Sequence, residues 1–574
     1  MTTTHSQNPR THILTNALED HFHAPAFRGV IGKKSWDRLE ARYEKSSLAA
    51  LELLARSNSS ATFFVNAWVA QRRPELLQEI IRQGQEVALS GDGGPGFRTL
   101  SRRDFRDELR RSRAIVEDAC GHRILGYRRS DVRLRPKHLA ALEVLAEEGF
   151  LYDSSLTPTG LAFRSQPWRR FVHQHQFGDS TLWEFPLSSH NFGGLMIPFA
   201  GGNYFRQYPE AFVRWAIHDW DRAQKHPLVL YFRVWDLDPT HPRIHTGSLM
   251  RDLRHYRNSG RMIQILGELF GMFRFNSIAG ALDLKQEPTL CTVSGATGNT
   301  VASLPPVDSN RILSPISVIV PCHNEEASIP YLVRSLDELK NELADSYAVQ
   351  FILVDDGSTD KTWELLCQHF EARPDSLLLR HEHNRGVSGA ILTGLDHAHE
   401  IACSMDCDCS YDPRELKPML ALLAEDADLV VASPYHPEGR VSNVPAWRLL
   451  LSRGASFLYR AVTGSKLHTF TSCLRVYRRS AALTVPLKHS GFLGIAELAG
   501  RFILDGRRIV EHPATLELRL FGRSKMRIAK TIGGHLHLLT NLAWSRFSAS
   551  RAPSSLSSTA SQPEVDSAKT PSLF

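Results

Sequence analysis

Hydrophobic residues in the second half of the chain form short runs that alternate with segments of helical spacing. The runs cover residues 316–321, 351–354 and 401–405, and each is apolar and either β-branched or followed by turn residues. Such runs are typical of buried parallel strands. The segments IPYLVRSLDELKNEL and KTWELLCQHFEA, which follow the first two runs, carry apolar residues at helical spacing. The alternation predicts βαβ units and a parallel sheet.

The first half of the chain also alternates between the two periods. Strand-like runs occur at ATFFVNA, EVALS and LVLYFRVW, and helical patterns occur at PELLQEIIRQ and RDFRDELRRSRAIVEDA. We therefore expect an α/β fold in both halves. The first half is expected to be a distorted (β/α) barrel or a related open sheet.

Two stretches of different composition divide the chain. Residues 285–314 are rich in Ser, Thr, Gly, Pro and Asn without a sustained period, which is typical of a linker. Residues 546–574 are of low complexity and are expected to be disordered. Because 574 residues are too many for one core, we predict two domains, at residues 1–284 and 315–545.

Composition limits the cellular setting. Hydrophobic residues make up 42% and charged residues 22%, as in ordinary globular proteins. No apolar stretch reaches the ~18 residues needed to span a bilayer, and the opening MTTTHSQNPRTH lacks the apolar segment of a secretory signal. We therefore expect a cytoplasmic protein, with peripheral contact at the inner face of the cell membrane as a hypothesis. A net charge of +7 suits a phosphorylated substrate or an anionic membrane, and no nucleic-acid motif is present.

An acidic cluster follows each of the three apolar runs, in CHNEE, DDGSTD and MDCDCSYDP. In open α/β sheets, ligands bind beyond the carboxyl ends of the strands. Carboxylates gathered there repel one another unless a cation lies between them, and a divalent metal that bridges a diphosphate is the usual cation. The clusters therefore predict an enzyme that binds a nucleotide-sugar. The alternative, that these acids only cap helices and turns, explains one cluster better than three.

Three of the eight cysteines, Cys403, Cys407 and Cys409, surround the third acidic cluster. In a reducing compartment they are poor disulfide partners. A CxC pair can ligate zinc, but no second Cys/His pair lies nearby in the sequence to complete four ligands. We interpret them as small apolar residues.

Residues 315–545 resemble a family 2 glycosyltransferase of the Rossmann-like GT-A fold, and in particular the polyprenyl-phosphate and dolichyl-phosphate mannose synthases. VPCHNEE resembles the family's VPxxNEE, VDDGSTDKT its VDDGSxDxT, and MDCDCSYDP its DADxQxxP. These motifs occur in the family's order. Ser410 stands where the family has Gln.

The resemblance implies a donor site and a metal. The residues expected to bind the nucleotide-sugar are Pro321, Asn324, Glu326, Asp355, Asp356 and Asp406. Within this set the two consecutive aspartates would hold the base, uracil or guanine, and the ribose. Asp406 and Asp408 form the family's DxD pair, which would hold Mg²⁺ or Mn²⁺ against the diphosphate, and Asp408 is expected to be catalytic.

The resemblance also implies an acceptor site. WRLLLSRGASFLYRAVTG resembles the family's WRKxxSRGANxL, and TFTSCLRVYRR resembles DxTSGFRAYRR, with Thr469 in place of Asp and Cys473 in place of Gly. Guanidinium groups suit bidentate phosphate binding, although arginines also occur on solvated helix faces. The residues expected to bind the acceptor or its phosphate are Arg448, Ser452, Arg453, Arg475 and Arg519.

Three further residues are expected to be catalytic. RLFGRSKM resembles the family's RxxGxSK loop, so Arg523 and Lys525 would close over the phosphates and exclude water. Glu497 is the candidate general base if the acceptor is a sugar hydroxyl, whereas a polyprenyl phosphate needs no base. The basic loop favours the phosphate. The segment TIGGHLHLLTNLAWSRF either lies on a bilayer surface or packs against its own domain.

Residues 12–280 resemble the NodB-type polysaccharide deacetylases, in LTNALEDHFH, ATFFVNAWVAQRRPEL, GYRRSDVRL and LYFRVWDLDPTHPR. The family uses an Asp base, Zn²⁺ held by one acid and two His, and a His as general acid. Most of these positions hold other residues here, and only the acid ligand survives, as Glu19 or Asp20. The base, the two His ligands and the general acid fall on Ala17, Ser90, Gly94 and Arg233. We therefore predict an inactive domain.

Two alternatives concern what remains of this domain. On a strand His21 and His23 would share a face and could ligate a metal, but a structural role is favoured. The retained aromatic and arginine residues suit a carbohydrate-binding groove and a core equally; they are Trp168, Trp183, Tyr204, Arg206 and Trp235.

The sequence as a whole predicts an inverting glycosyltransferase. It would move a sugar from a nucleotide-diphosphate donor to a polyprenyl-phosphate or glycan acceptor in polysaccharide or glycolipid biosynthesis, beside a noncatalytic deacetylase-like domain. One alternative is a bifunctional polysaccharide deacetylase and glycosyltransferase. The other is a nonenzymatic carbohydrate-binding assembly protein.

Overall fold

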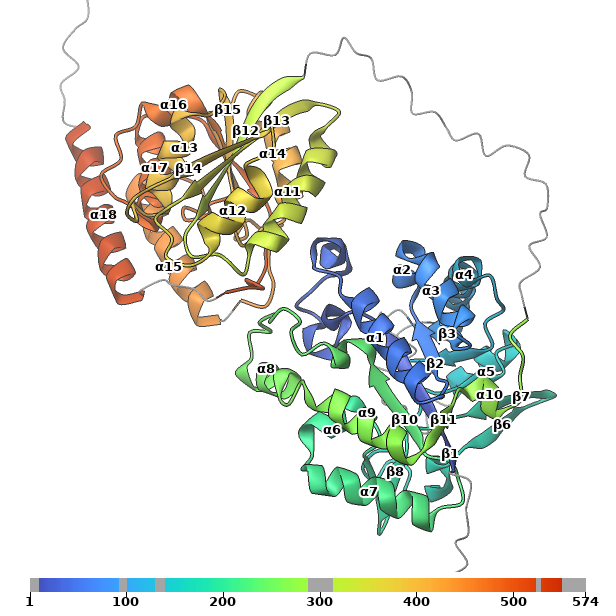
Figure 1. Cartoon of the computed structure of the whole chain (residues 1–574). Helices are drawn as coiled ribbons and strands as arrows, with labels where there is room; N and C mark the ends of the chain where they lie inside the picture. The colour runs from blue at the N-terminus through green and yellow to red at the C-terminus, as the bar shows by residue number, and fades with distance from the viewer. Residues whose placement is uncertain are drawn as a thin grey trace, which may run out of the picture. The chain divides into compact units, whose positions relative to one another are not determined.

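The computed structural model describes residues 10–91, 101–129, 140–287, 313–444, 446–522 and 528–549 (Figure 1). The chain forms two compact units. One holds the described residues up to 287 together with Leu518–Phe521, and the other holds the remaining residues from 313. Residues 288–312 of the predicted linker and 550–574 of the predicted tail lie outside the described part. Within the described part, no helix is both long and apolar enough to cross a membrane.

The first unit is an open, distorted (β/α) barrel. Its main sheet has the order β10-β1-β2-β3-β4-β5-β7-β6, with β11 also paired to β1, and only β6 runs antiparallel to its neighbour. The strands are β1 (Thr11–Leu18), β2 (Thr62–Val65), β3 (Glu86–Ser90), β4 (Gly126–Arg128), β5 (Tyr152–Asp153), β6 (His173–Phe177), β7 (Ser180–Glu184), β8 (Ser189–Phe192), β9 (Leu195–Pro198), β10 (Val229–Arg233) and β11 (Arg274–Asn276). The α-helices are α1 (Tyr43–Arg56), α2 (Ala67–Arg72), α3 (Pro74–Arg82), α4 (Arg102–Cys120), α5 (Ala140–Glu147), α6 (Gly202–Gln207), α7 (Glu210–Ala223), α8 (Leu249–Tyr256), α9 (Arg261–Met272) and α10 (Ile278–Ala281).

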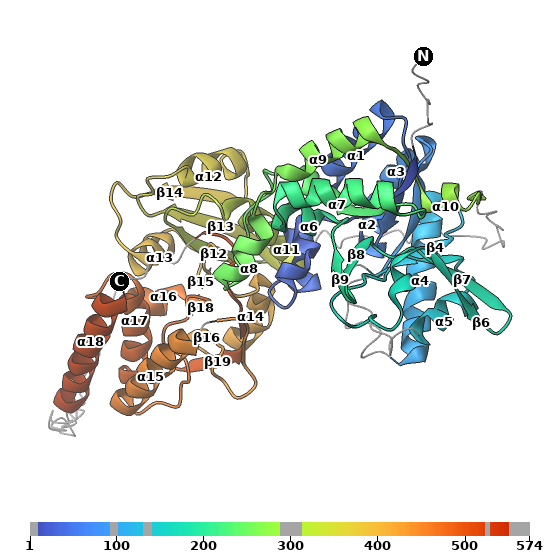
Figure 2. The ribbon, with the colours of Figure 1, turned by 90° about the horizontal axis from the view of Figure 1, so that it is seen from below.

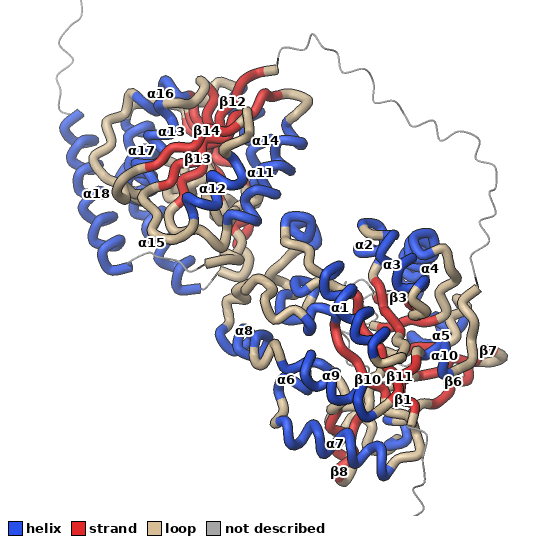
Figure 3. The backbone as a smooth tube through the Cα atoms, viewed as in Figure 1, coloured by secondary structure: helices blue, strands red, loops and turns tan. Residues whose placement is uncertain are grey.

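Hydrophobic cores lie on both sides of this sheet. In β1, Leu14 belongs to the larger core and Ile13 to a separate, smaller one. Helices flank the strands (Figure 3). Because the strands are buried on both faces, their sequences are nearly continuous apolar runs and do not alternate between apolar and polar residues.

Two buried carboxylates, Asp153 and Glu184, face each other across β5 and β7. Burial raises the pKa of Glu184 from 4.5 to about 7 and raises the pKa of Asp153 well above its usual range. In the unfolded chain Glu184 ionises at a lower pH than in the folded protein. The stability that the protonated Glu184 contributes is therefore fully present below pH 4.5 and is lost as the pH rises through 7.

We expect Glu184→Gln to stabilise the first unit relative to wild type, and increasingly so at higher pH. The amide keeps the hydrogen bonds of the protonated acid without its ionisation. Between pH 5 and pH 8 the difference in unfolding free energy should grow by on the order of 2 kcal/mol. Thermal unfolding of both proteins across this range checks it. A difference that does not change with pH would show that Glu184 ionises as freely in the folded state as in the unfolded one.

The second unit is built on a seven-stranded sheet of order β14-β13-β12-β15-β18-β16-β19. The strands are β12 (Ser314–Cys322), β13 (Tyr347–Asp355), β14 (Ser376–Arg380), β15 (Ile401–Ser404), β16 (Leu429–Ser433), β17 (Arg440–Val441), β18 (Arg475–Arg478), β19 (Ile509–Pro513) and β20 (Thr515–Leu516). The α-helices are α11 (Ile329–Leu343), α12 (Thr362–Phe370), α13 (Val387–Asp396), α14 (Leu416–Ala424), α15 (Ala446–Thr463), α16 (Arg479–Leu483), α17 (Phe492–Leu504) and α18 (Ile528–Ala549).

The sheet changes its winding direction at β12, which pairs in parallel with β13 on one side and with β15 on the other. Cys322 is level with Asp355, and Ile319 is level with Ser404. The carboxyl ends of these three strands therefore lie at one edge. The three acidic clusters predicted from the sequence meet there, at the point where open α/β sheets bind ligands.

Candidate active site

The loops after β12 and β13 are bonded to each other. The side-chain oxygen of Asn324 accepts hydrogen bonds from the backbone N–H of Thr359 at 2.7 Å and of Asp360 at 3.3 Å. The Asn324 N–H donates to Ser358 Oγ at 2.9 Å. Asn324 has a φ of 52°, a left-handed conformation that Asn tolerates better than most residues. The expected nucleotide residue Asn324 thus fixes the shape of both loops.

The other two residues of the first motif lie beside this junction. Pro321 is level with Val354 near the end of the β12–β13 pair. The carboxylate of Glu326 is exposed and accepts from the Lys361 N–H at 3.3 Å. Both residues are therefore at the carboxyl edge of the sheet, as the motif predicted.

Asp355 and Asp356 are buried, and their carboxylates are held in place by groups at the end of β14 and just after it. Asp355 Oδ2 lies 3.1 Å from Arg380 Nε. Asp356 Oδ1 accepts from His381 Nδ1 at 2.8 Å and from the Arg385 N–H at 2.7 Å. Each of the two neighbouring carboxylates thus has a cation or hydrogen-bond donors beside it, which fixes its orientation.

Arg380, His381 and Arg385 were missed by the sequence reasoning. The apolar run at 377–379, directly before the segment RHEHNR, was the available signal of a fourth strand ending at the site. Close packing of the loops also depends on Gly357, which has a φ of 68°. A Cβ there would lie 2.9 Å from the Asn384 nitrogen. Only glycine fits this position without shifting the backbone.

The third cluster follows β15. Asp408 Oδ1 accepts from Ser410 N–H at 2.9 Å and Ser410 Oγ at 2.6 Å, so the residue that replaces the family's Gln orients the catalytic candidate. Asp406 is bonded through its carbonyl to the Cys409 N–H at 3.1 Å. Burial and the nearby Asp406 raise the pKa of the Cys473 thiol well above its usual range, so this thiol stays neutral beside the carboxylate.

Asp406 and Asp408 fit a divalent cation that also binds phosphate. Both are half-buried, and their side chains are carboxylates, the oxygen ligands that Mg²⁺ and Mn²⁺ take. Among the described residues, no group of three His, Cys, Asp or Glu side chains could hold a metal by itself. A Mg²⁺ ion needs no such group, because it commonly binds one or two carboxylates together with substrate phosphates and water.

The predicted acceptor residues have varied surroundings. Arg453 of α15 is exposed and lies 5.4 Å over the Tyr435 ring, with Ser452 beside it. Arg519 Nε donates to the Phe521 carbonyl at 2.7 Å. Arg475 is fully buried, and its guanidinium donates to backbone carbonyls of the preceding loop. The side chain of Arg448 and the whole of Arg523 and Lys525 lie outside the described residues.

Glu497 on α17 is also fully buried. Its carboxylate accepts from the N–H groups of Lys488 and His489 at 3.0 and 2.9 Å, from His489 Nδ1 at 2.9 Å and from Arg501 Nε at 2.8 Å. Burial opposes ionisation, but the bonds from His489 and Arg501 outweigh it and lower the pKa of Glu497. The carboxylate is therefore ionised and anchors the loop before α17.

Comparison with known proteins decides the family. The sequence model described as Glycosyl transferase family 2 matches residues 317–485. The chain is 33% identical over 217 residues to the polyprenol monophosphomannose synthase of Mycolicibacterium smegmatis, covering 36% of this chain and 80% of that protein. The chain belongs to glycosyl transferase family 2. The resemblance predicted from the ordered motifs is confirmed, and the protein is a glycosyltransferase.

The chain is also similar to other known proteins. The undecaprenyl-phosphate mannosyltransferase of Micrococcus luteus is 29% identical over 218 residues, 37% of this chain and 87% of that protein. Two solved structures are similar at a TM-score of 0.32: glucosyl-3-phosphoglycerate synthase of Mycobacterium tuberculosis, with Mn²⁺, UDP and product (18% identity, 41% of this chain, 80% of that chain), and a polysaccharide deacetylase from Mycobacterium smegmatis (20% identity, 48% and 96%).

The first unit of this glycosyltransferase matches two further models. The Polysaccharide deacetylase model matches residues 36–136, and a domain of unknown function, DUF3473, matches residues 154–283. The deacetylase resemblance predicted from the sequence is thereby confirmed as a fold. Ala17 and Arg233, at the expected positions of the base and the general acid, are cross-strand neighbours in β1 and β10. Ser90 ends β3, and Gly94 lies outside the described residues.

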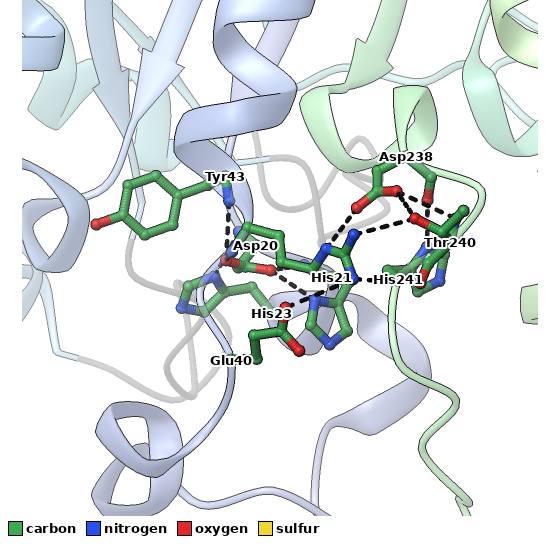
Figure 4. Close-up of polar contacts among 9 residues, drawn as sticks. Asp20, His21, His23, Glu40, Tyr43, Asp238, Thr240 and His241 are labelled. Atoms are coloured by element: carbon green, nitrogen blue, oxygen red, sulfur yellow. Dashed lines mark hydrogen bonds and ion pairs between the residues drawn. The ribbon is translucent and has the colours of Figure 1, made fainter. Parts of the chain in front are cut away.

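Both candidates for the surviving acid ligand in the glycosyltransferase's first unit are engaged in structural contacts. Glu19 Oε1 accepts from Arg233 Nε at 2.5 Å. Asp20 is fully buried and accepts from His21 N–H and Nδ1 at 2.7 and 2.6 Å, and from the N–H groups of Arg42 and Tyr43 at 2.6 and 3.0 Å (Figure 4). Burial opposes ionisation of Asp20, but the bond from His21 leads the contacts that lower its pKa.

His21 and His23 lie in a single 3₁₀ turn, so the prediction that they share a face of a strand is wrong. Asp20 caps this turn, which is why the chain leaves the strand direction after β1. His23 Nδ1 accepts from the Asp20 N–H at 2.9 Å, and its ring packs edge-on against Trp36 and Trp68. Burial lowers the pKa of His23 to about 3, so it is neutral and serves the core.

Proposed function

We propose that the glycosyltransferase transfers a hexose, with mannose the first candidate, from a nucleoside-diphosphate sugar to a polyprenyl phosphate with inversion. The observation that carries this is the meeting of three acidic clusters at the winding switch of one sheet, with Asp355 and Asp356 already fixed by neighbouring donors. The names of the two mannosyl-transferring relatives support the sugar and the lipid acceptor.

The roles of the donor residues follow from their positions. Asp355 and Asp356 would bind the base and ribose, and the loop held by Asn324, with Pro321 and Glu326, would enclose them. Asp406 and Asp408 would hold Mg²⁺ or Mn²⁺. When bound, that ion would neutralise charge that develops on the departing diphosphate. Ser410 orients Asp408 for this contact.

A phosphate acceptor suits the state of Glu497. A carboxylate that already accepts four hydrogen-bond donors is poorly placed to remove a proton. A polyprenyl phosphate is anionic at neutral pH and attacks without a base. Under this proposal Glu497 positions the loop before α17, Arg475 positions the loop before β18, and the exposed Arg453 with Arg448 and Ser452 serves the acceptor phosphate. Arg523 and Lys525 would close over both phosphates.

A thermal-shift screen with nucleoside diphosphates tests the donor site. A ligand that binds only the folded state raises the apparent melting temperature. We expect GDP or UDP to stabilise the second unit when Mn²⁺ is present, and to do so much less with EDTA. Equal shifts with adenosine, cytidine, guanosine and uridine diphosphates, or shifts independent of metal, would contradict a specific donor site.

We also propose that the second unit contacts a membrane surface, where a polyprenyl phosphate resides. Helices α15, α17 and α18 pack side by side (Figure 2). While Leu538, Leu539 and Leu542 of α18 face a core, several large apolar side chains of α15 and α18 are exposed. They are Leu450, Leu451, Phe457, Leu458, Ile532, Leu536, Trp544 and Phe547.

The expected result is flotation of the protein with anionic liposomes and weaker flotation of a Phe457→Ser, Trp544→Ser double variant. Each exposed aromatic side chain is worth roughly 2 kcal/mol when it enters an apolar phase. Phe192→Ser, an equally polar change at an exposed residue of the first unit, is the matched control. Protein that stays wholly in the soluble fraction would count against membrane contact.

A further inference from the structure

A cavity of about 390 Å³ in the first unit is rich in arginine. It lies among β4, β10, α6 and α8, all within one compact unit. Among its described lining residues are five arginines and no Asp or Glu. They are Arg128, Arg206, Arg233, Arg251 and Arg254. A concave site lined by one sign of charge concentrates ligands of the opposite sign.

The guanidinium groups of three of these arginines, Arg128, Arg206 and Arg233, are buried in the cavity wall. Arg128 is 2% exposed; it lies 3.7 Å over the Tyr231 ring, and Nη1 donates to the neutral Ser154 Oγ at 2.9 Å. Arg206 is equally buried. The Nε atoms of Arg128 and Arg206 have no hydrogen-bond partner among the described residues. A buried cation whose hydrogen-bond donors lack acceptors costs free energy, unless a bound anion accepts those hydrogen bonds.

The carboxylates behind the wall compensate this charge only in part. Arg206 lies 3.3 Å from Asp236, and Arg233 lies 2.5 Å from Glu19. Arg128 has Asp153 and Glu184 in its neighbourhood, but burial raises the pKa of Asp153 well above its usual range and that of Glu184 to about 7, so at neutral pH these acids offset its charge only in part. The wall therefore carries more positive than negative charge, and exposed Arg251 and Arg254 on α8 add to it at the rim.

Aromatic side chains complete the lining. Tyr204 on α6, Tyr231 on β10 and Trp235 just after β10 contribute to the same cavity, and Arg206 lies 4.9 Å over the Trp235 ring. Aromatic faces beside polar groups are the usual surroundings of a bound sugar ring. Of the residues for which groove and core were equally expected, Tyr204, Arg206 and Trp235 thus line a cavity, whereas Trp168 is exposed and Trp183 packs against a core.

We propose that this cavity binds an anionic saccharide, with the oxyanion of a phosphate or carboxylate group against Arg128, Arg206 and Arg233 and the sugar ring against Tyr204 and Trp235. Ala17 and Arg233 lie side by side where a deacetylase is expected to have its base and its general acid. The same change that removes this acid–base pair also makes the cavity wall cationic. The first unit then contributes recognition of an acidic glycan or a sugar phosphate. This inference is independent of the transferase proposal.

Calorimetric titration of the full chain tests it with three probes: glucose 1-phosphate, trigalacturonate and neutral maltotriose. We expect one or both charged probes to bind, with an affinity that falls as salt is added, and maltotriose to bind far more weakly. Phosphate binding points to a sugar phosphate, and trigalacturonate binding points to an acidic glycan.

Variants assign the binding to this cavity. The exposed pair Arg251→Gln and Arg254→Gln should weaken binding about tenfold, and the buried Arg128→Gln should weaken it about 30-fold where circular dichroism shows a native fold. The exposed pair Arg56→Gln and Arg222→Gln is the matched control and should bind as wild type does. Asp408→Ala should also leave this binding unchanged.

Three outcomes would overturn the proposal. They are no binding of either charged probe, equal binding of maltotriose, and loss of binding in Asp408→Ala with retention in the Arg251, Arg254 double variant. The last would place the charged probe in the second unit and would leave the transferase proposal standing.

Discussion

Replacing Asp408 with alanine should lower sugar transfer by about a thousandfold while the protein stays folded. The carboxylate is half-buried at the carboxyl edge of the sheet, and two hydrogen bonds from Ser410 fix its orientation. Its loss would leave the charge on the departing diphosphate uncompensated. Initial rates with a labelled nucleotide-sugar, at saturating Mn²⁺, measure the effect.

Asp505→Ala is the matched control, because it removes an exposed carboxylate from the same unit, after α17. It should transfer sugar at the wild-type rate. Melting temperatures of both variants should stay close to that of wild type. If Asp408→Ala retained more than about a tenth of the activity, the ~1.4 kcal/mol lost would be too small for a group that stabilises the leaving diphosphate.

The full chain supplied with Zn²⁺ should release no acetate from N-acetylated oligosaccharides above the level of a protein-free blank. Zinc-dependent deacetylation needs a base, imidazole ligands and a general acid around the metal. Ala17 and Arg233 stand at two of these positions, and the buried Asp20 carboxylate already accepts from four donors. An active deacetylase of the same fold, assayed in parallel, shows that the assay works.

Asp20→Asn separates the structural role of Asp20 from a catalytic one. We expect it to destabilise the first unit by on the order of 3 kcal/mol, because an amide cannot accept all of the bonds now made to the carboxylate. Sugar transfer should be unaffected at temperatures where the variant is folded. Zinc-dependent acetate release that Asp20→Asn abolished would establish the bifunctional alternative instead.

The sequence predicted the parts of the site that depend on local order along the chain. The apolar runs before CHNEE, DDGSTD and MDCDCSYDP are strands, and parallel pairing brings their ends together because all carboxyl ends of parallel strands meet at one edge. This reasoning was not applied to β14, because its short apolar run at 377–379 was not recognised as a strand. The groups that hold Asp355 and Asp356 were therefore not expected.

The sequence could not show which groups each charged side chain contacts in the folded protein. Arg475 matches a motif that predicts phosphate binding, yet its guanidinium bonds to nearby carbonyls in the interior. Glu497 matches an acidic position near the acceptor, yet Arg501 and the loop at His489 surround its carboxylate. Motif spacing fixes residue identity, whereas the burial of a side chain and the groups it contacts depend on how the surrounding loops fold.

We expect the second unit to transfer a sugar to a lipid phosphate. The most direct measurement incubates the full chain with GDP-mannose or a UDP-hexose, undecaprenyl phosphate and Mn²⁺, and follows the nucleoside diphosphate and the organic-phase sugar together. We expect equal amounts of nucleoside diphosphate and glycosyl phospholipid, with the anomeric configuration inverted. Release of nucleoside diphosphate and free sugar without a lipid product, or no turnover of any donor, would contradict the account.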